Sequence, residues 1–343
     1  MKISKKILEK NPLFIAEVGQ NHQGSFKLAC KYVEVFSKLG ANIIKFQMRD
    51  NKGLFSKEAF EKEYSTKNSF GKTYGVHRNK LELSIVEIKK LKNFCKKNKV
   101  EIMVTPFDEV SFYKLCKIGV NLIKISSFDL GNLPLIKTIA QKKKKIFMSV
   151  GGGDDKEIDS SIKLANKYGI KPIILHCVSE YPCPAQSLGL NRIKHLIKKY
   201  PGHTIGSSDH FSGILSGPVA YLEGARVFEK HVTFDRTWKG TDHNFSLEPE
   251  GFRKFVRDTK RVGLMLKPKS QKKIGKEYVF QKLGKSIISK KLIKKGEKIK
   301  LDFLTGKIFF EQFIPIRQTH KILGKIAKKN ILKNQPITLK DIR

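Results

Sequence analysis

The sequence predicts an α/β fold, a (β/α)8 barrel followed by a small mostly-β domain, and three observations lead to it. Eight short apolar segments recur along the chain, amphipathic helical patterns lie between them, and a polar stretch follows the last. Strands that are apolar almost without alternation are buried on both faces, as in parallel sheets. Eight such units in about 250 residues fit a closed barrel. A doubly wound sheet is the alternative.

The predicted strands, in order, are FIAEV (14–18), NIIKF (42–46), EIMVT (101–105), NLIKI (121–125), KIFMSV (145–150), KPIILHC (171–177), HTIGS (203–207) and RVFEKH (226–231). Intervening stretches such as LACKYVEVFSKLG and GFRKFVRDTKRVGLML place apolar residues at i, i+3, i+4 and i+7, as on an amphipathic helix. Residues 49–80 have no clear period, and we expect a long loop over the barrel mouth.

The pattern changes after the last barrel helix, because LKPKSQKKIG (266–275) is polar, basic and contains Pro. We therefore divide the chain into a barrel domain (1–265), a linker (266–282) and a small domain (283–343). About 60 residues form a marginal core, so we expect the small domain to lean on the barrel or on a second subunit.

The net charge of +38 raises the question of a nucleic-acid partner. Lysine greatly outnumbers arginine and lies in short clusters through the whole chain, without aromatic interleaving or a basic tail. This distribution favours a solvated lysine-rich surface over a polyanion-binding face. The charge also attracts small anionic substrates.

The remaining composition predicts a cytoplasmic protein that does not bind membranes. No apolar run approaches membrane-spanning length, and the basic N-terminus lacks the apolar stretch of a signal peptide. Five dispersed cysteines (Cys30, Cys95, Cys116, Cys177 and Cys183) argue against a disulfide framework and a cysteine-based zinc site, and predict reduced thiols.

Polar side chains end nearly every predicted strand, where a (β/α)8 barrel builds its active site. They are Glu17, Lys45, Gln47, Thr105, Lys124, Ser127, Asp129, Ser149, Ser179, Tyr181, Ser208, His210 and His231. Lysines and hydroxyls suit a phosphate and a carboxylate, whereas His210 and His231, at the ends of adjacent strands, suit a divalent metal. His176 and His203 are interpreted as structural residues.

These residues lie in motifs that resemble those of the sialic acid synthase (N-acetylneuraminate synthase) family. The motifs are IAEVGQNHQG, IIKFQ, VTPFD, IKISSFD, LHCVSEYP, IGSSDH and FEKHVTFDRTWKGTDHNFSLEP, in the family's order across residues 14 to about 265. The segments SIISKKLIKKGEKI and LGKIAKKNILKNQPITLKDI resemble more loosely the family's C-terminal antifreeze-protein-like (SAF) domain.

The resemblance implies that phosphoenolpyruvate condenses with an N-acetylmannosamine-like aldehyde sugar to give a nonulosonic acid and phosphate. It implies Mn2+ or Mg2+ at His210 and His231, and Glu17, Asp129 and Asp242 as catalytic carboxylates. Gln47 and Tyr181 would bind the sugar, beside Glu17 and Asp242. Phosphoenolpyruvate would contact Lys45, Thr105, Lys124, Ser127, Ser149, Ser179 and Ser208.

Three features depart from the family pattern. Asp129 stands where family members commonly carry Glu, and SVGGG replaces STG, which makes a more permissive anion-binding turn. The family's Arg-Pro-Gly motif, whose Arg enters the partner subunit's site, is replaced by LTGKIFFEQFIPIRQTH, where Lys307 or Arg317 could substitute.

The small tail and the resemblance together predict a domain-swapped homodimer. Alternatives are a legionaminic, pseudaminic or phosphosugar-derived acid synthase, or a catalytically silent sugar-binding protein on the same fold. The sequence shows no second ordered Arg cluster for a phosphosugar. This favours an unphosphorylated acceptor.

Overall fold

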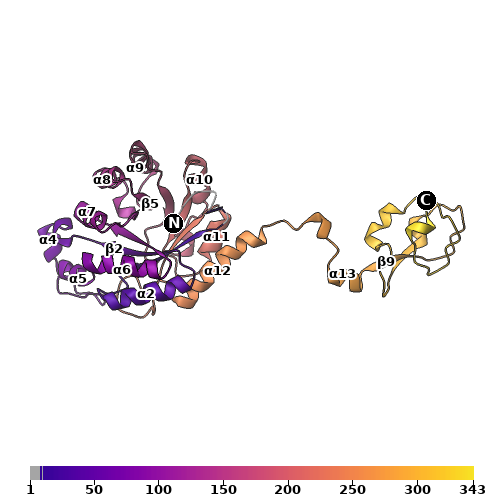
Figure 1. The fold of residues 1–343 in the computed structure, drawn as a ribbon, viewed down its shortest axis with the longest axis horizontal. Coiled ribbons are helices and arrows are strands. Elements are labelled where there is room, and N and C mark those ends of the chain that lie inside the picture. Colours follow the sequence, from indigo (N-terminus) through magenta and orange to yellow (C-terminus); the bar gives the residue numbers. More distant parts are fainter. Residues whose placement is uncertain (1–7, 10) are drawn as a thin grey trace. The chain divides into compact units, whose positions relative to one another are not determined.

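The computed structural model describes residues 8, 9 and 11–343, which form two compact units that divide between Leu266 and Lys267. The first unit is an eight-stranded barrel and the second is a small C-terminal unit (Figure 1). Within the described part of the chain, every helix is too short or too polar to cross a membrane. The five cysteines are free, as predicted.

The barrel contains eight strands that pair in parallel and in sequence order, and it closes where β1 meets β8. They are β1 (Leu13–Gly19), β2 (Ile43–Met48), β3 (Glu101–Pro106), β4 (Leu122–Ile125), β5 (Lys145–Ser149), β6 (Ile173–Cys177), β7 (Ile205–Asp209) and β8 (Val227–His231). The predicted barrel is confirmed, and the closure excludes the doubly wound sheet.

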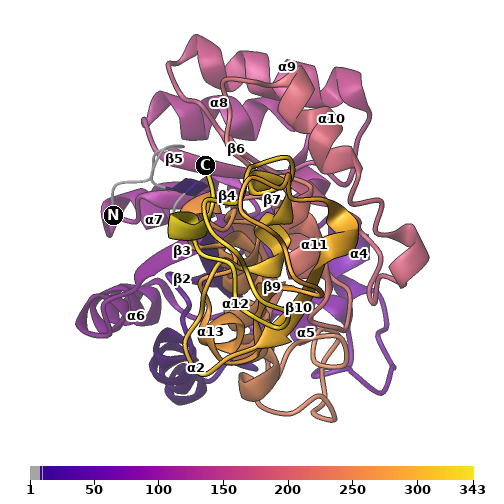
Figure 2. The ribbon, with the colours of Figure 1, turned by 90° about the vertical axis from the view of Figure 1, so that its right-hand side faces the viewer.

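Eight helices, one between each strand and the next and one after β8, cover the outside of the barrel (Figure 2). These helices are α2 (Phe26–Lys38), α6 (Ile85–Lys97), α7 (Glu109–Lys117), α8 (Leu133–Gln141), α9 (Asp155–Lys167), α10 (Arg192–Lys199), α11 (Ser216–Leu222) and α12 (Pro249–Met265). Local sequence fixes several starts: Ser84 with Glu87 and Asp154 with Glu157 form capping boxes that satisfy backbone N–H groups of α6 and α9.

The segment after β2 is more ordered than the sequence predicted. Residues 49–80 contain three short helices, α3 (Asn51–Leu54), α4 (Lys57–Glu61) and α5 (Tyr74–Lys80). The expectation of an irregular loop was wrong in this respect, because elements of four to seven residues are too short to show a hydrophobic period. Ser56 and Thr73 cap the last two through their side-chain oxygens.

Alternation along the strands separates two cores and positions the site. Residues such as Phe14, Ala16 and Val18 face outward and pack under the helices. The inward residues at the amino ends of the strands fill the barrel; they are Leu13, Ile15, Ile43, Met103, Leu122, Phe147, Ile173, Leu175 and Val227, with Leu8 packed against them. The next inward position on most strands is polar, so the barrel interior becomes charged toward its carboxyl end.

Gly206 on β7 leaves the room that this interior packing needs. A Cβ at Gly206 would lie 2.5 Å from the Val227 carbonyl oxygen and 2.6 Å from Leu175 Cδ2. We expect Gly206→Ala to lower the free energy of unfolding by about 1–3 kcal/mol, the usual cost of overpacking. Urea denaturation monitored by circular dichroism measures this, and a midpoint equal to that of the wild type would contradict it.

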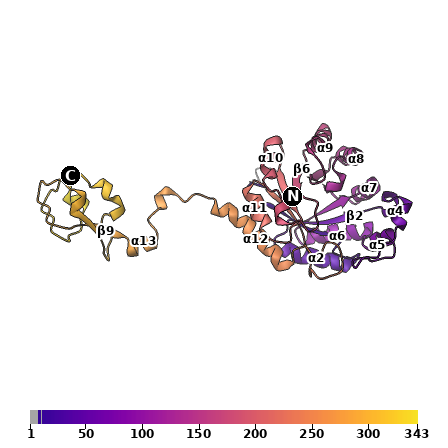
Figure 3. The ribbon, with the colours of Figure 1, turned by 180° about the vertical axis from the view of Figure 1, so that it is seen from behind.

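The C-terminal unit is built around one antiparallel pair, β9 (Lys285–Ser289) and β10 (Leu304–Ile308), preceded by α13 (Tyr278–Leu283) (Figure 3). Isolated bridges and 3-10 turns make up most of the remainder. Its core consists of Ile287, Ile293, Ile299, Phe303, Leu304, Ile322, Ala327, Ile331, Ile337 and Ile342. The predicted small domain therefore has a core of its own, and the domain boundaries stay a prediction.

Candidate active site

A cavity of about 900 Å³ opens at the carboxyl ends of the strands. All the predicted site residues except Ser179 line it: Glu17, Lys45, Gln47, Thr105, Lys124, Ser127, Asp129, Ser149, Tyr181, Ser208, His210, His231 and Asp242. Ser179 lies outside the lining, and its Oγ is buried without a hydrogen-bond partner among the described residues. The strand-end pattern thus corresponds to one continuous surface.

Two lysines and two carboxylates form a buried charged cluster at the base of this cavity. Lys45 Nζ lies 3.1 Å from both Glu17 Oε1 and Glu229 Oε1. Lys124 Nζ lies 3.6 Å from Glu229 Oε1. Parallel pairing explains the meeting, because Glu17 is in register with Lys45 on β2 and with His231 on β8.

The pKa values of the two carboxylates in the cluster shift in opposite directions. Burial raises the pKa of Glu17, more than the attraction of Lys45 lowers it. Burial also raises the pKa of Glu229, but the charges of Lys124 and Lys45 lower it further, so Glu229 stays ionised. Burial lowers the pKa of Lys124, whereas the two carboxylates raise that of Lys45. Burial thus favours the neutral form of Glu17, whereas the ionised Glu229 lies between the two lysines.

Several buried oxygen atoms around this cluster lack partners within the part of the chain that the structure describes. They include Ser149 Oγ and one carboxylate oxygen each of Glu17 and Glu229. Ser127 Oγ accepts a bond from Gly151 N at 3.3 Å and keeps its own proton to donate. An anionic ligand that accepts from the serines and the lysines would remove part of this cost, which is about 1–3 kcal/mol per buried group.

The glycines after β5 serve close approach of the backbone. A Cβ at Gly151 would lie 2.6 Å from the Cys177 carbonyl oxygen, and one at Gly152 would lie 2.3 Å from that of Ser127. Gly151, Gly152 and Gly153 are absent from the positive-φ glycines of the described chain. The glycines of SVGGG are therefore needed because a side chain would not fit next to Ser127 and Cys177. The sequence suggested that they give the turn conformational freedom, but none of the three adopts a positive φ.

His210 and His231 face one another in a geometry that fits a divalent cation. Their ring centroids are 5.3 Å apart. His210 Nδ1 lies 2.7 Å from the Val178 carbonyl oxygen; since a carbonyl only accepts, Nδ1 carries the proton and Nε2 offers its lone pair. Burial lowers the pKa of His231 to about 4, which keeps the ring neutral. Its Nδ1 is buried and lacks a hydrogen-bond partner among the described residues.

The imidazole pair fits a cation only as part of a larger coordination sphere. Asp242 Oδ2 lies 3.8 Å from His231 Nδ1. The described residues contain no group of three or more His, Cys, Asp or Glu side chains arranged to hold a metal. Two imidazoles with substrate oxygens or water as further ligands are the arrangement that these residues support.

Three further predicted residues, Tyr181, Gln47 and Asp129, line the cavity. Tyr181 stacks on His210, with ring centroids 4.1 Å apart. Gln47 Nε2 donates to Glu17 Oε1 at 2.7 Å. Asp129 accepts bonds from Ser126 Oγ at 2.8 Å and Asn132 Nδ2 at 3.1 Å, and burial raises its pKa. Asp129, whose side chain is one methylene shorter than the Glu expected at this position, is thus held in the cavity wall.

The sequence analysis missed Glu229, Cys177, Arg49 and Arg78, which also line the cavity. Three of them were open to detection, because strand residues two apart face the same side. Glu229 precedes His231 by two, Arg49 follows Gln47 by two, and Cys177 ends the strand of Leu175. Arg78 belongs to α5, in the segment without a period, and gave no signal.

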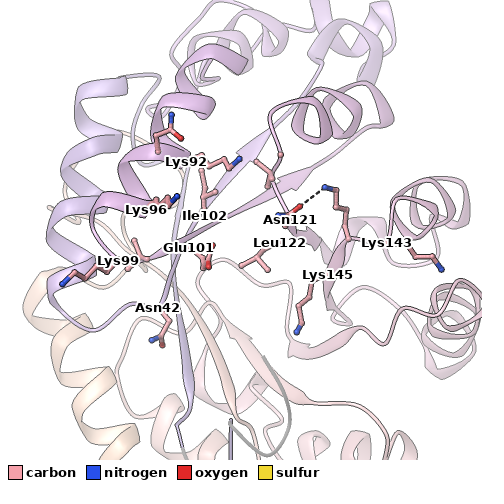
Figure 4. Close-up of a pocket in the computed structure, with 15 residues that line it drawn as sticks. Asn42, Lys92, Lys96, Lys99, Glu101, Ile102, Asn121, Leu122, Lys143 and Lys145 are labelled. Atoms are coloured by element: carbon pink, nitrogen blue, oxygen red, sulfur yellow. Dashed lines mark hydrogen bonds between the residues drawn. The ribbon is translucent and has the colours of Figure 1, made fainter. Parts of the chain in front are cut away.

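A second cavity of about 770 Å³ lies at the opposite, amino end of the barrel, next to the starts of β2, β3, β4 and β5. It is lined by Glu101, amides and apolar residues together with six lysines, which are Lys92, Lys96, Lys99, Lys143, Lys144 and Lys145. In Figure 4, Lys99 and Lys143 stand at opposite sides of this cavity, so the ammonium groups do not converge. Catalytic residues in such barrels gather at the carboxyl end, where the first cavity lies.

Fold and site together define a class: a (β/α)8-barrel enzyme whose cavity, at the carboxyl ends of the strands, combines a buried lysine cluster with two imidazoles. The chain belongs to the NeuB family, whose model matches residues 32–271. It is therefore a phosphoenolpyruvate-dependent enzyme of sugar-acid synthesis that forms a carbon–carbon bond.

The relatives span several members of this class. The chain is 32% identical to a mouse N-acetylneuraminate-9-phosphate synthase, over 92% of this chain and 89% of that protein. It is 33% identical to an N,N'-diacetyllegionaminic acid synthase of Campylobacter jejuni, over 96% and 99%. A crystal structure of an N-acetylneuraminic acid synthetase from Leptospira borgpetersenii matches with a TM-score of 0.69 and 30% identity, over 79% of this chain and 92% of that one.

Proposed function

We propose that the protein condenses phosphoenolpyruvate with an open-chain amino sugar such as N-acetylmannosamine and releases a nine-carbon, sialic-acid-type acid and phosphate. The observation that carries this proposal is the buried Lys45–Lys124 cluster facing His210 and His231 across one cavity. An acceptor of legionaminic or pseudaminic acid synthesis is the alternative, since such synthases are among the relatives.

In this proposal, Lys45, Lys124 and the hydroxyls of Ser127 and Ser149 hold the phosphate and carboxylate of phosphoenolpyruvate. Thr105 and Ser208 lie beside them, and the Ser208 hydroxyl donates to Glu229 Oε1 at 2.9 Å. Supporting it, Lys45 Nζ lies 3.4 Å from Thr105 Oγ1, and Ser149 Oγ has no other partner within the described chain. Ser179 is less well supported, because it lies outside the cavity lining. Preorganised cations and hydroxyls of this kind stabilise charge as it moves onto the leaving phosphate.

The acceptor's aldehyde would lie at His210 and His231, with Gln47, Tyr181 and Asp242 along its chain. Mn2+ or Mg2+ held there would supply Lewis-acid polarisation of the aldehyde oxygen. The enol carbon of phosphoenolpyruvate attacks the aldehyde carbon and forms one carbon–carbon bond. The new alkoxide takes a proton, for which the buried Glu17 is the candidate because its raised pKa favours the protonated form.

The attack leaves an oxocarbenium centre at the second carbon of phosphoenolpyruvate. Water adds to that carbon, and the carbon–oxygen bond to phosphate breaks, which produces the ketone of the product without a covalent enzyme intermediate. Asp129 is the candidate to orient this water or to take its proton, because burial raises its pKa while Ser126 and Asn132 fix its direction.

Phosphate release from phosphoenolpyruvate with Mn2+, measured against a panel of amino sugars, their 6-phosphates and arabinose 5-phosphate, tests this function. Release that requires a sugar, and a product of the mass of sugar plus pyruvate, would support it. Should phosphoenolpyruvate bind while none of these acceptors triggers release, the proposed acceptor class would be wrong.

Lys124 offers a sharper test of the phosphoenolpyruvate site. We expect Lys124→Ala to raise KM for phosphoenolpyruvate by about tenfold or more, equivalent to about 1.4 kcal/mol, and to change KM for the sugar much less. Steady-state kinetics in both substrates measures the split. Lys96→Ala, an exposed lysine at the amino end of the barrel, is the matched control. An unchanged KM for phosphoenolpyruvate would remove Lys124 from the anion site.

We also propose a domain-swapped homodimer in which the C-terminal unit of one chain closes the partner's barrel, with Lys307 or Arg317 in the role of the family's arginine. Within its own unit, Lys307 Nζ donates to Asn334 Oδ1 at 3.1 Å and Arg317 Nη2 to the Gly275 carbonyl at 2.9 Å. Sedimentation velocity at micromolar concentration should give a dimer. A monomer with full activity would refute the swap.

A further inference from the structure

Two arginines line the active-site cavity without a role in the chemistry described above. Arg49 follows β2, and Arg78 lies on α5, in the segment that the sequence analysis expected to be a loop. Gln20, just beyond β1, joins them in the cavity lining. We refer to Arg49, Arg78 and Gln20 as the mouth cluster.

Arg49 is held by several contacts, and these engage both oxygens of the Glu82 carboxylate. Its Nη1 donates to Glu82 Oε1 at 3.1 Å, its backbone N donates to Glu82 Oε2 at 3.0 Å, and its Nη2 donates to Gln47 Oε1 at 2.6 Å. The guanidinium also stacks over Phe107, 3.9 Å from the ring centroid. Glu82 is therefore engaged by Arg49 through both carboxylate oxygens.

Arg78 is different, because it has donors to spare. Its Nη1 donates to Gln20 Oε1 at 2.6 Å. Its Nε and Gln20 Nε2 are both buried, and neither has a hydrogen-bond partner within the described part of the chain. A buried donor without a hydrogen-bond partner costs about 1–3 kcal/mol of folding free energy. The Arg78 and Gln20 side chains, which share one hydrogen bond, each carry such a donor. A ligand that accepts from both would remove this cost.

The local charge indicates that this ligand is an anion. Arg49 and Arg78 line the same cavity, and the pKa of Arg49 is lowered by burial and by the positive charge of Arg78. Glu82 and Asp242 are the carboxylates that oppose this effect on Arg49. Glu82 is already paired, and Asp242 lies beside His231, in the part of the cavity assigned to the acceptor.

A chain of hydrogen bonds connects the mouth cluster to the catalytic end of the cavity. Gln47 Nε2 donates to Glu17 Oε1, and Gln47 Oε1 accepts from Arg49 Nη2. The sugar-binding candidate Gln47 thus lies between the buried charged cluster and the mouth cluster. An acceptor with its aldehyde at the imidazole pair and its chain along Gln47 would direct its far end toward Arg78.

We propose that Arg78, supported by Arg49 and Gln20, forms a phosphate subsite, and that the acceptor is a sugar carrying a phosphate monoester on the carbon farthest from its aldehyde. Guanidinium groups bind phosphate oxygens through paired, charge-assisted hydrogen bonds. This deepens the proposed function and rests on it. It also replaces the expectation of an unphosphorylated acceptor, which was based on the absence of a second arginine cluster from the sequence. Arg49 and Arg78 are far apart in the sequence and line the same cavity only in the fold.

The test compares N-acetylmannosamine with N-acetylmannosamine 6-phosphate as acceptors for the full-length protein with Mn2+. We expect kcat/KM to be at least tenfold higher for the phosphate. We expect Arg78→Gln to lower the ratio of the two kcat/KM values by about tenfold, and Arg78→Lys, which keeps the charge but loses the fork, to lower it less. Arg261→Gln on the exposed face of α12 is the control, with the ratio of the wild type.

Several results would overturn the subsite. The first is a wild-type ratio of the two kcat/KM values near one, and the second is a ratio that Arg78→Gln leaves unchanged. The third is a rise in KM for phosphoenolpyruvate in Arg78→Gln as large as the rise for the phosphosugar, which would assign Arg78 to phosphoenolpyruvate binding. Calorimetric titration with N-acetylmannosamine 6-phosphate separates this proposal from the proposed function. Without turnover on any acceptor, binding that is lost in Arg78→Gln still supports the subsite, and absence of binding to the wild type refutes it.

Discussion

Replacement of His210 by alanine is expected to lower kcat/KM by more than about 100-fold. Loss of a partner that merely orients a metal ligand already costs about 10- to 100-fold, and His210 is proposed as a ligand itself, with Nε2 directed by the bond between its Nδ1 and the Val178 carbonyl. Chelation with EDTA should abolish activity in the wild type, and Mn2+ should restore it. In the variant, Mn2+ binding measured by electron paramagnetic resonance should weaken as well.

The matched control is His203→Ala, because His203 also bonds a backbone carbonyl through Nδ1, that of Pro172 at 2.8 Å, but lies outside the cavity lining. Wild-type kinetics and Mn2+ binding are expected for it. Full turnover in excess EDTA would exclude the metal role of the imidazole pair. If His210→Ala bound Mn2+ as tightly as the wild type, His210 would not be a metal ligand.

The second large effect is expected from Glu229, which lies between the two buried lysines. Glu229→Gln keeps the size of the side chain but leaves Lys45 and Lys124 without the carboxylate that lies 3.1 and 3.6 Å away. Breaking a buried ion pair by removing one partner costs about 3–5 kcal/mol. We expect a loss of this size in the free energy of unfolding, measured by urea denaturation at neutral pH.

The pH dependence of this loss has a definite sign. Burial raises the pKa of Glu229 and the two lysines lower it further, so the folded-state pKa lies below the ordinary value of 4.5. Its stabilising contribution is present at neutral pH and is lost as the pH falls below about 4.5 toward that lower pKa. The wild type and Glu229→Gln should therefore converge in stability at acid pH. A neutral-pH difference below about 1 kcal/mol would show that the lysines lose their charge instead of remaining unpaired.

Much of the candidate site was open to prediction because strands in a parallel barrel all end on the same side. Once Lys45, Lys124 and His231 were placed at strand ends, the fold required them to share one mouth. The same rule, applied at every second residue, would have added Glu229. Glu229 lies one inward position deeper in the barrel than His231, the strand-end residue that the sequence indicated.

The sequence by itself determined the barrel, the order of its strands and the polar ring at their carboxyl ends, because a periodic apolar pattern encodes which face of each element is buried. Only the tertiary structure decided how the charges are paired, that Ser179 lies outside the cavity lining, and that Arg78 lines the same cavity as Arg49. Those outcomes depend on distances between segments far apart in the chain and on short helices without a period. Local sequence carries no record of either.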